Sequence, residues 1–279
     1  MKEDVKSLRG LAGRPGLRRI AGRHNPQLKE LRQAFRRSEL TTEGECAIEG
    51  VKLVEEAIRS GLRLGGVFFA ESAQAIANKL LPQINAHVET LLLPDALFKS
   101  VVPSDSPQGV AALVRMRPVS ADQVLDCSTT GPVVVAAGLQ DPGNLGTILR
   151  SAEAFGAAGV FLTEGTVSPY NAKVLRGSAG SIFRLPVVQI TSGELIPLLR
   201  KRNVRMIATS SHKGIPLPEA NWTLPLAIFI GNEGAGLSRD LMHQMDDTVV
   251  IPQAAQVESL NAGVAASIVL YECMRQRSG

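Results

Sequence analysis

The sequence predicts an α/β protein in which helices cover both faces of a parallel β-sheet. Short runs of Val, Ile, Leu and Phe alternate with stretches of helical periodicity along most of the 279 residues. Glycines such as Gly61 and Gly156 stand where helices would end. Two polar loops, Gly231–Ser238 and Ser259–Gly263, each follow an apolar run. Because α/β proteins bind ligands where parallel strands end, we expect a small-molecule site in the C-terminal part.

The first 24 residues form a basic arm. Residues 1–40 hold eleven Lys or Arg against four acids, a net charge of +7 that leaves −3 for the rest of the chain. This excess fits either a solvated charged face or an arm that contacts nucleic-acid phosphates. A mitochondrial transit peptide fits less well, because Glu3 and Asp4 are atypical of one.

Residues 25–116 predict a compact α/β module of about ninety residues. Asn25 and Pro26 form the signature of an N-cap and a first-turn proline, which predicts a helix to about Ser38. The elements expected after it are strands Cys46–Glu49, Val67–Ala70, His87–Leu93 and Val110–Met116, with helices Val51–Ser60 and Ala73–Leu81 and a short helix from Asp95.

Residues 117–131, rich in Pro, Asp, Ser and Thr, predict a linker to a second domain at 132–279. There the alternation is clearer, and Thr191 and Glu194 have the spacing of a capping box. The expected strands are Val133–Ala137, Gly159–Thr163, Arg184–Ile190, Val204–Thr209, Leu226–Ile230 and Thr248–Ile251. The expected helices are Leu145–Phe155, Ala172–Gly177, Thr191–Arg202, Ser238–Met245 and a long one capped by Ser259.

The composition argues against several classes of protein. No apolar run approaches the length of a membrane span, and the N-terminus lacks the apolar core of a signal peptide, so we expect no membrane and a cytoplasmic location. Cys46, Cys127 and Cys273 lie far apart without metal-ligand spacing, which disfavours a metal site and a disulfide framework. Aromatic residues make up only 4%, which disfavours base stacking as the main mode of nucleic-acid binding.

Three loops could carry chemistry, although each has a structural explanation. Asn144 is placed to cap the helix that follows, and Arg150 stands near the start of that helix, where a cation opposes the helix dipole. A surface ion pair is the alternative for Arg150. Glu233 lies among glycines in a loop that lacks both the G-x-G-x-x-G and the P-loop spacings. The small residues after Asn261 fit core packing, a dimer interface or a tight chain crossing.

Taken together and in this order, the loops resemble the three signature motifs of the SpoU/TrmH family of RNA ribose 2′-O-methyltransferases, part of the SPOUT class. The matching stretches are Asn144–Arg150, Gly231–Ser238 and Ser259–Asn261 running into Leu270–Glu272, with Lys173–Gly180 as a further family segment. The resemblance implies a homodimer whose catalytic domain ends in a trefoil knot that binds S-adenosylmethionine. It also implies that the first domain is a small RNA-binding domain.

The resemblance assigns roles by position. It implies cofactor binding, largely through backbone atoms, at Thr209, Gly231, Ile251 and Leu260, and it implies catalytic positions at Asn144, Arg150, Glu233, Ser259 and Asn261. Methyl transfer from a sulfonium needs no metal. Arg150 would be the base, or would hold the RNA phosphate while the 2′ proton leaves by another route, because a guanidinium normally stays protonated.

The expected activity is methylation of a ribose 2′-OH in structured RNA. Large-subunit (23S) ribosomal RNA is favoured over transfer RNA, since similar two-domain proteins mostly act on it. A non-catalytic RNA-binding or ribosome-assembly protein of the same fold is the first rival. A nucleotide-dependent oxidoreductase is the second, and the missing glycine fingerprint argues against it.

Overall fold

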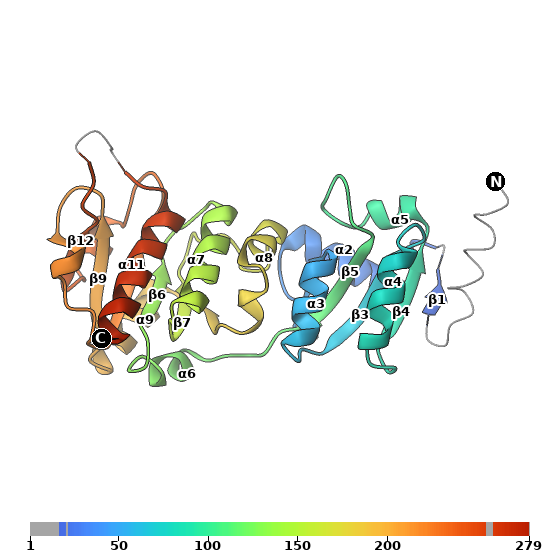
Figure 1. Cartoon of the computed structure of the whole chain (residues 1–279), viewed down its shortest axis with the longest axis horizontal. Helices are drawn as coiled ribbons and strands as arrows, with labels where there is room; N and C mark the ends of the chain where they lie inside the picture. Colours follow the sequence, from blue (N-terminus) through green and yellow to red (C-terminus); the bar gives the residue numbers. More distant parts are fainter. Residues whose placement is uncertain (1–16, 21, 255–258, 279) are drawn as a thin grey trace. The chain divides into compact units, whose positions relative to one another are not determined.

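The computed structural model describes residues 17–20, 22–254 and 259–278 (Figure 1). Most of the predicted basic arm therefore lies outside the described residues. The chain divides into two compact units. Unit 1 is the chain up to Arg117 together with Tyr170–Leu175, and unit 2 is Pro118–Pro169 together with the chain from Arg176.

Unit 1 is built on a five-stranded sheet of order β1-β4-β3-β5-β2. Strands β1, β4 and β3 are parallel, whereas β5 runs antiparallel to β3 and β2. The strand β1, which the sequence did not predict, lies in the basic arm and pairs with β4 at the sheet edge. The strands are β1 (Leu17–Arg19), β2 (Glu45–Glu49), β3 (Leu64–Ala70), β4 (Glu89–Leu93) and β5 (Val110–Arg115).

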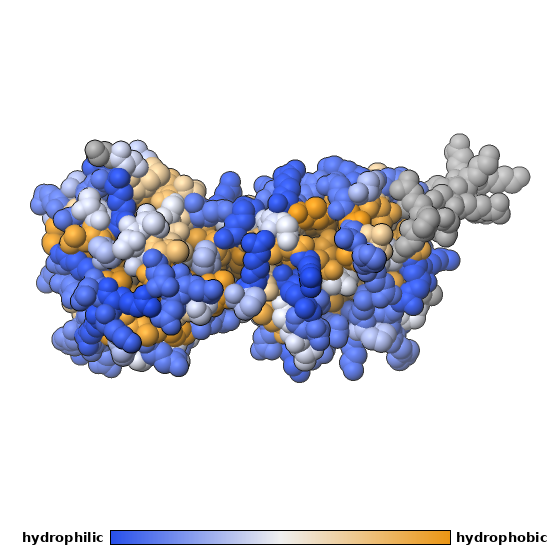
Figure 2. Space-filling model, turned by 90° about the horizontal axis from the view of Figure 1, so that it is seen from below, coloured by the Kyte–Doolittle hydropathy of each residue, from blue (hydrophilic) through white to orange (hydrophobic). Residues whose placement is uncertain are grey.

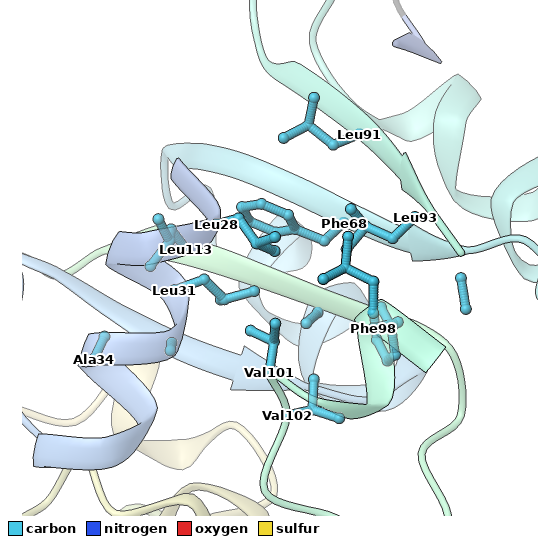
Figure 3. Close-up of a cluster of buried hydrophobic side chains, with 14 of the residues drawn as sticks. Leu28, Leu31, Ala34, Phe68, Leu91, Leu93, Phe98, Val101, Val102 and Leu113 are labelled. Carbon is cyan, nitrogen blue, oxygen red and sulfur yellow. The ribbon is translucent and has the colours of Figure 1, made fainter. Parts of the chain in front are cut away.

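The first helix of unit 1 begins where its capping residue predicts. Asn25 caps the first helix, accepting a hydrogen bond of 3.2 Å from the Leu28 N–H. Leu28 and Leu31 of this helix pack with Phe68 and Phe98 in one hydrophobic core, so the helix covers a sheet face (Figure 3). The helices are α2 (Pro26–Arg37), α3 (Val51–Arg59), α4 (Gln74–Leu80), the short 3-10 helix η1 (Leu81–Gln83) and α5 (Asp95–Lys99).

The predicted linker contains a helix, α6 (Ala121–Asp126). Ser120 and Gln123 form a capping box at its start, and its Val124 and Leu125 are buried in the core of unit 2. The turn-forming composition of this segment concealed the helix, because Ser and Asp also favour helix N-termini.

Unit 2 is built on a seven-stranded sheet of order β10-β12-β9-β11-β6-β7-β8, in which every pair is parallel. This confirms the predicted parallel α/β class. The strand Arg184–Ile190 was predicted too long, since a 3-10 helix ends at Phe183 and Pro186 has no N–H for the ladder. The strands are β6 (Val133–Ala136), β7 (Gly159–Leu162), β8 (Val187–Gln189), β9 (Arg205–Ser210), β10 (Ile215–Pro216), β11 (Leu226–Ile230) and β12 (Asp247–Val250).

Helices cover the sheet of unit 2. Buried side chains of α6 and α9 share a core with β6, β9 and β11, and α7 lies beside α11 (Figure 1). The predicted capping box of Thr191 and Glu194 is confirmed at the start of α9. The helices are α7 (Pro142–Ala154), α8 (Ala172–Ser178), η2 (Ser181–Phe183), α9 (Ser192–Lys201), η3 (Leu217–Glu219), α10 (Arg239–Met242) and α11 (Ala262–Ser278).

Two predicted caps were wrong by a few residues. Asp141, not Asn144, caps α7, because Pro142 takes the first helical position and the Asp141 carboxylate accepts from the Asn144 N–H at 2.8 Å. Asn261, not Ser259, caps α11, because its Oδ1 reaches the N–H groups of Gly263 and Val264 at 3.0 and 3.2 Å.

The surface seen in Figure 2 is mostly hydrophilic with smaller hydrophobic areas between. In the described part of the chain, no helix combines the length and the apolar character needed to cross a membrane. The large apolar side chains that are exposed include three on α11, namely Val264, Ile268 and Tyr271.

Candidate active site

A cavity of about 900 Å³ opens among the loops that follow β9, β11 and β12. These strands are parallel neighbours, so their carboxyl ends meet at one edge of the sheet. The strand β11 lies between β9 and β6, although it follows both in sequence. Such a change in strand order separates the loops and leaves room for a ligand. The volume falls within the range of about 300–1,000 Å³ typical of small-molecule sites.

Seven of the nine predicted site residues line this cavity. All four predicted cofactor-binding residues do so, together with three of the five predicted catalytic ones: Thr209, Gly231, Ile251, Leu260, Glu233, Ser259 and Asn261. The Thr209 hydroxyl donates to the Phe229 carbonyl oxygen at 3.1 Å and so fixes the end of β9 against β11. The three loops are separate in sequence, because each follows a different strand, and the parallel sheet brings them together.

The loop after β11 is held in a tight turn by its own backbone. Asn232 and Gly236 exchange two backbone hydrogen bonds of 3.0 and 2.9 Å, and the Asn232 Oδ1 accepts from the N–H groups of Gly234 and Ala235. A Cβ at Gly231 would lie 2.3 Å from the Gly236 carbonyl carbon. The turn therefore requires glycine at position 231, because no other residue leaves the returning backbone enough room.

Glu233 joins this loop to the start of α7. Its Oε1 accepts from the Asp141 N–H and the Asn144 Nδ2, both at 3.0 Å, and its Oε2 accepts from the Gln140 N–H at 3.3 Å. Desolvation acts to raise the pKa of Glu233, but these hydrogen bonds outweigh it and lower the pKa below its ordinary value. The carboxylate is thus ionised at neutral pH and serves as a fixed acceptor.

Asn144 and Arg150 do not line the cavity. Asn144 is buried at 5% exposure and reaches the site through Glu233. Arg150 is exposed on α7, and within residues 17–20, 22–254 and 259–278 no hydrogen bond or ion pair is recorded for it. The surface ion pair considered for Arg150 is therefore absent from the described part of the chain.

The small residues of α11 make a close crossing with α7. A Cβ at Gly263 would lie 3.0 Å from the Thr147 Cβ, and the hydroxyls of Ser151 and Ser267 are 2.7 Å apart. One side of α11 therefore packs tightly against α7, which is the core-packing explanation of the sequence pattern.

Asn232 is a structural residue of the site that the sequence prediction missed. Its Nδ2 donates to the Gly138 carbonyl oxygen at 3.0 Å, which ties the loop after β11 to the loop after β6. The signal in the sequence was an Asn two residues before a glycine, a pattern typical of a turn closed by the Asn side chain.

A parallel sheet whose C-terminal loops enclose one large cavity defines an α/β protein that binds a small molecule at its strand ends. Comparison with protein families assigns the two parts of the chain. Residues 131–271 match the SpoU rRNA Methylase family, and residues 25–112 match the MRM3-like substrate binding domain. The chain belongs to the SpoU rRNA methylase family, and it is a methyltransferase.

Curated relatives span nearly the whole chain. The 23S rRNA (guanosine(2553)-2′-O)-methyltransferase RlmP of Bacillus subtilis is 30% identical over 91% of this chain and 98% of its own. The 23S rRNA (uridine(2479)-2′-O)-methyltransferase of Streptomyces viridochromogenes is 31% identical over 94% of both chains.

The chain is also similar to a solved structure of a SpoU methyltransferase. The SpoU methyltransferase AviRb from Streptomyces viridochromogenes, in complex with the cofactor AdoMet, is 28% identical and superposes with a TM-score of 0.78. The match covers 91% of this chain and 99% of that one.

Proposed function

We propose that this methyltransferase takes its methyl group from S-adenosylmethionine and places it on a ribose 2′-oxygen of 23S ribosomal RNA. The observation that carries the proposal is the cavity after β9, β11 and β12. All four residues expected to bind the cofactor line this cavity. The relatives named above support the substrate class, because both are named for 2′-O-methylation of 23S rRNA. Transfer RNA is the second candidate substrate.

The residues of the cavity fit this cofactor. Apolar side chains suited to an adenine ring stand beside backbone groups of the tight turn at Gly231. The larger apolar side chains of the lining are Ile230, Leu237, Met242, Val249, Ile251, Leu260 and Val269. A cavity that combines apolar side chains with polar groups suits a cofactor that has an apolar ring and polar substituents.

The trefoil knot expected at the C-terminal end is part of the proposal. Its support is the strand order, because β11 lies between β6 and β9 although it follows both in sequence, and α11, later still in the chain, packs on α7.

S-adenosylmethionine, when bound, would supply a methyl group on a positively charged sulfur, and that sulfur would be left as a neutral thioether once the methyl group is on the 2′-oxygen. The protein aligns the ribose and helps its 2′ proton to leave. Arg150 either accepts that proton or holds the neighbouring phosphate. Asn144 and Glu233 fix the two loops between which the ribose lies, and Ser259 and Asn261 shape the pocket wall.

A homodimer is also proposed. Val264, Ile268 and Tyr271 lie along one side of α11 at helical spacing, with 46%, 36% and 50% of their surfaces exposed. An apolar stripe of this kind is typical of a protein interface.

RNA binding by unit 1 is supported by two observations. Residues 25–112 match a substrate-binding domain, and the N-terminal arm is basic. A ribosomal RNA substrate would place the enzyme in the cytoplasm.

Transfer of tritium from labelled S-adenosylmethionine tests the proposal. The purified protein is incubated separately with unmodified 23S rRNA, 16S rRNA and total tRNA. We expect label in 23S rRNA. Label in tRNA alone would establish the second candidate, and label in no RNA, with no cofactor binding by calorimetry, would favour the non-catalytic RNA-binding protein.

A further inference from the structure

The helix α2 carries a larger excess of positive charge than the other α-helices described in unit 1. Its twelve residues include four Lys or Arg and one acid, whereas α3 has two of each and α5 has one of each. The cations of α2 are Lys29, Arg32, Arg36 and Arg37, and the acid is Glu30. The positive charge of the first 40 residues is therefore not confined to the basic arm.

The cations of α2 lie on the side of the helix that faces away from the core. The buried side chains of α2 pack against the sheet from its other side (Figure 3). Lys29 and Arg36 are exposed, and Arg32 between them is half-buried. Because residues three, four and seven apart share one side of a helix, these three cations form a row about 10 Å long. Arg37 is exposed next to the end of the row.

The cations of α2 are not neutralised by acids of unit 1. Within the described residues, none of the four has an ion pair, whereas Arg19 of the basic arm pairs with Glu71 at 2.6 Å and Lys79 of α4 pairs with Glu55 at 2.7 Å. Residues 1–16, which lie outside the described residues, hold four basic residues and two acids, so their own net charge is also positive. The row is thus a local concentration of uncompensated positive charge.

Helix stability explains only part of this charge. Arg36 and Arg37 lie in the last turn, where a cation interacts favourably with the helix dipole. Lys29 and Arg32 lie outside that turn, so the dipole does not account for them. Arg32 and Arg36 are like charges four residues apart, an arrangement that destabilises a helix. A bound polyanion would remove this repulsion, which indicates that the row serves binding.

We propose that the row of Lys29, Arg32 and Arg36, with Arg37 beside it, binds the sugar–phosphate backbone of the RNA substrate. The inference rests on the function proposed above and adds a helix face to the basic arm as an RNA contact. Residues 25–112, which include α2, match a substrate-binding domain, so RNA is the polyanion expected at this surface. A guanidinium also presents paired N–H donors that match two phosphate oxygens.

The contacts of this surface are with phosphates and not with bases. Phe35, the one aromatic residue of α2, packs against the core, so the exposed side of the helix offers no aromatic ring for base stacking. Contacts to phosphates position an RNA without reading its sequence. The row therefore holds the substrate, and the identity of the methylated nucleotide is set elsewhere.

Filter binding of the full chain to unmodified 23S rRNA at several salt concentrations tests the inference. The double variant Lys29→Gln/Arg36→Gln removes two exposed cations from the row. We expect it to bind RNA at least about tenfold more weakly at about 0.1 M salt, and its plot of log Kd against log salt concentration to be shallower by about one to two. The KM for RNA should rise with little change in kcat. The variant Lys29→Arg/Arg36→Lys keeps both charges and should bind within about threefold of the wild type.

A matched control removes two exposed cations elsewhere in unit 1. Arg59→Gln/Lys79→Gln changes residues of α3 and α4 that already belong to ion pairs, so it should bind RNA as the wild type does. Unchanged binding of S-adenosylhomocysteine in calorimetry shows that each variant is folded. Equal RNA affinity and equal salt dependence of the two double variants would overturn the inference. Loss of binding to polyglutamate with RNA binding intact would also overturn it, in favour of an acidic protein partner. A wild type that binds no RNA would instead overturn the proposed function.

Discussion

The carboxylate of Glu233 accepts a hydrogen bond of 3.0 Å from the side-chain amide of Asn144, 89 residues earlier in the chain. This contact joins the loop after β11 to the first turn of α7. The loop lines the cavity and α7 carries Arg150, so the pair connects the proposed cofactor site to the proposed catalytic arginine.

The Glu233–Asn144 pair should show measurable coupling. In a double-mutant cycle of Glu233→Ala and Asn144→Ala, we expect the unfolding free energies to depart from additivity by about 1 kcal/mol, the net value of a typical hydrogen bond. Urea unfolding of the four proteins measures this. Strict additivity would show that the contact contributes nothing to stability.

Arg150 should act in the reaction and not in folding. Arg150 is proposed to accept the 2′ proton or to hold the phosphate, so Arg150→Ala should reduce methyl transfer at least about 100-fold. Because Arg150 is exposed and does not line the cavity, the same substitution should leave S-adenosylhomocysteine binding unchanged. Arg239→Ala, at an exposed arginine of α10, is the control and should remain active. Equal activity of Arg150→Ala and the wild type would remove Arg150 from the mechanism.

The variant Arg150→Lys separates the two roles of Arg150. A lysine keeps the charge that holds a phosphate, so that role predicts partial activity with an unchanged pH profile. If Arg150 is the base, the pH–rate profile should shift to lower pH, because an amine loses its proton more readily than a guanidinium.

Gly231 should tolerate no side chain. A Cβ there would lie 2.3 Å from the Gly236 carbonyl carbon, so Gly231→Ala must open the turn. We expect a loss of about 1–3 kcal/mol in unfolding free energy and weaker cofactor binding. Gly193→Ala is the matched control, because a Cβ at Gly193 on α9 meets no atom within 4 Å. It should leave stability unchanged or raise it by up to about 1 kcal/mol. Equal behaviour of the two variants would contradict the packing argument.

Glu272 should make stability depend on pH in the acid range. Hydrogen bonds from Arg275 and Gln276 lower the pKa of Glu272 from an ordinary 4.5 to about 2. A lowered pKa stabilises the fold above pH 4.5, and this contribution is lost as the pH falls through about 2. Glu272→Gln should therefore be less stable than the wild type at pH 7, with the difference shrinking below pH 4.5. A difference independent of pH in thermal melts would argue against this ion pair.

The exposed stripe of α11 should hold the proposed dimer together. Ile268→Asp places a charge in the middle of the stripe and should convert a dimer into a monomer in sedimentation experiments. Leu224→Asp, at an exposed leucine outside α11, is the control and should stay dimeric. A wild type that sediments as a monomer would contradict the proposal.

Much of the fold could be predicted because local signals agreed with the tertiary structure. Asn25, Thr191 and Glu194 cap helices as the sequence indicates. The alternation of predicted strands and helices after residue 132 corresponds to the parallel sheet of unit 2 and its helices. The predicted caps at Asn144 and Ser259 were misplaced because a second residue that can cap a helix, Asp141 or Asn261, stands within three positions of each. Only the hydrogen bonds of Asp141 and Asn261 distinguish between them.

The site was predicted less completely, because its contacts depend on strand order. Sequence motifs placed Gly231, Ile251 and Leu260, all of which line the cavity. The bond from Asn232 to Gly138 appears only once β11 lies between β6 and β9. Sequence spacing carries no information about that insertion.

The chemical position of the transferred methyl group is the most direct test of the central claim. Alkali cleaves RNA through the free 2′-hydroxyl, so a 2′-O-methylated nucleotide survives as part of a labelled dinucleotide. After tritium transfer to 23S rRNA and complete alkaline hydrolysis, we predict that the label stays in alkali-stable dinucleotides. Label in mononucleotides would mean methylation of a base and would contradict ribose 2′-O-methylation.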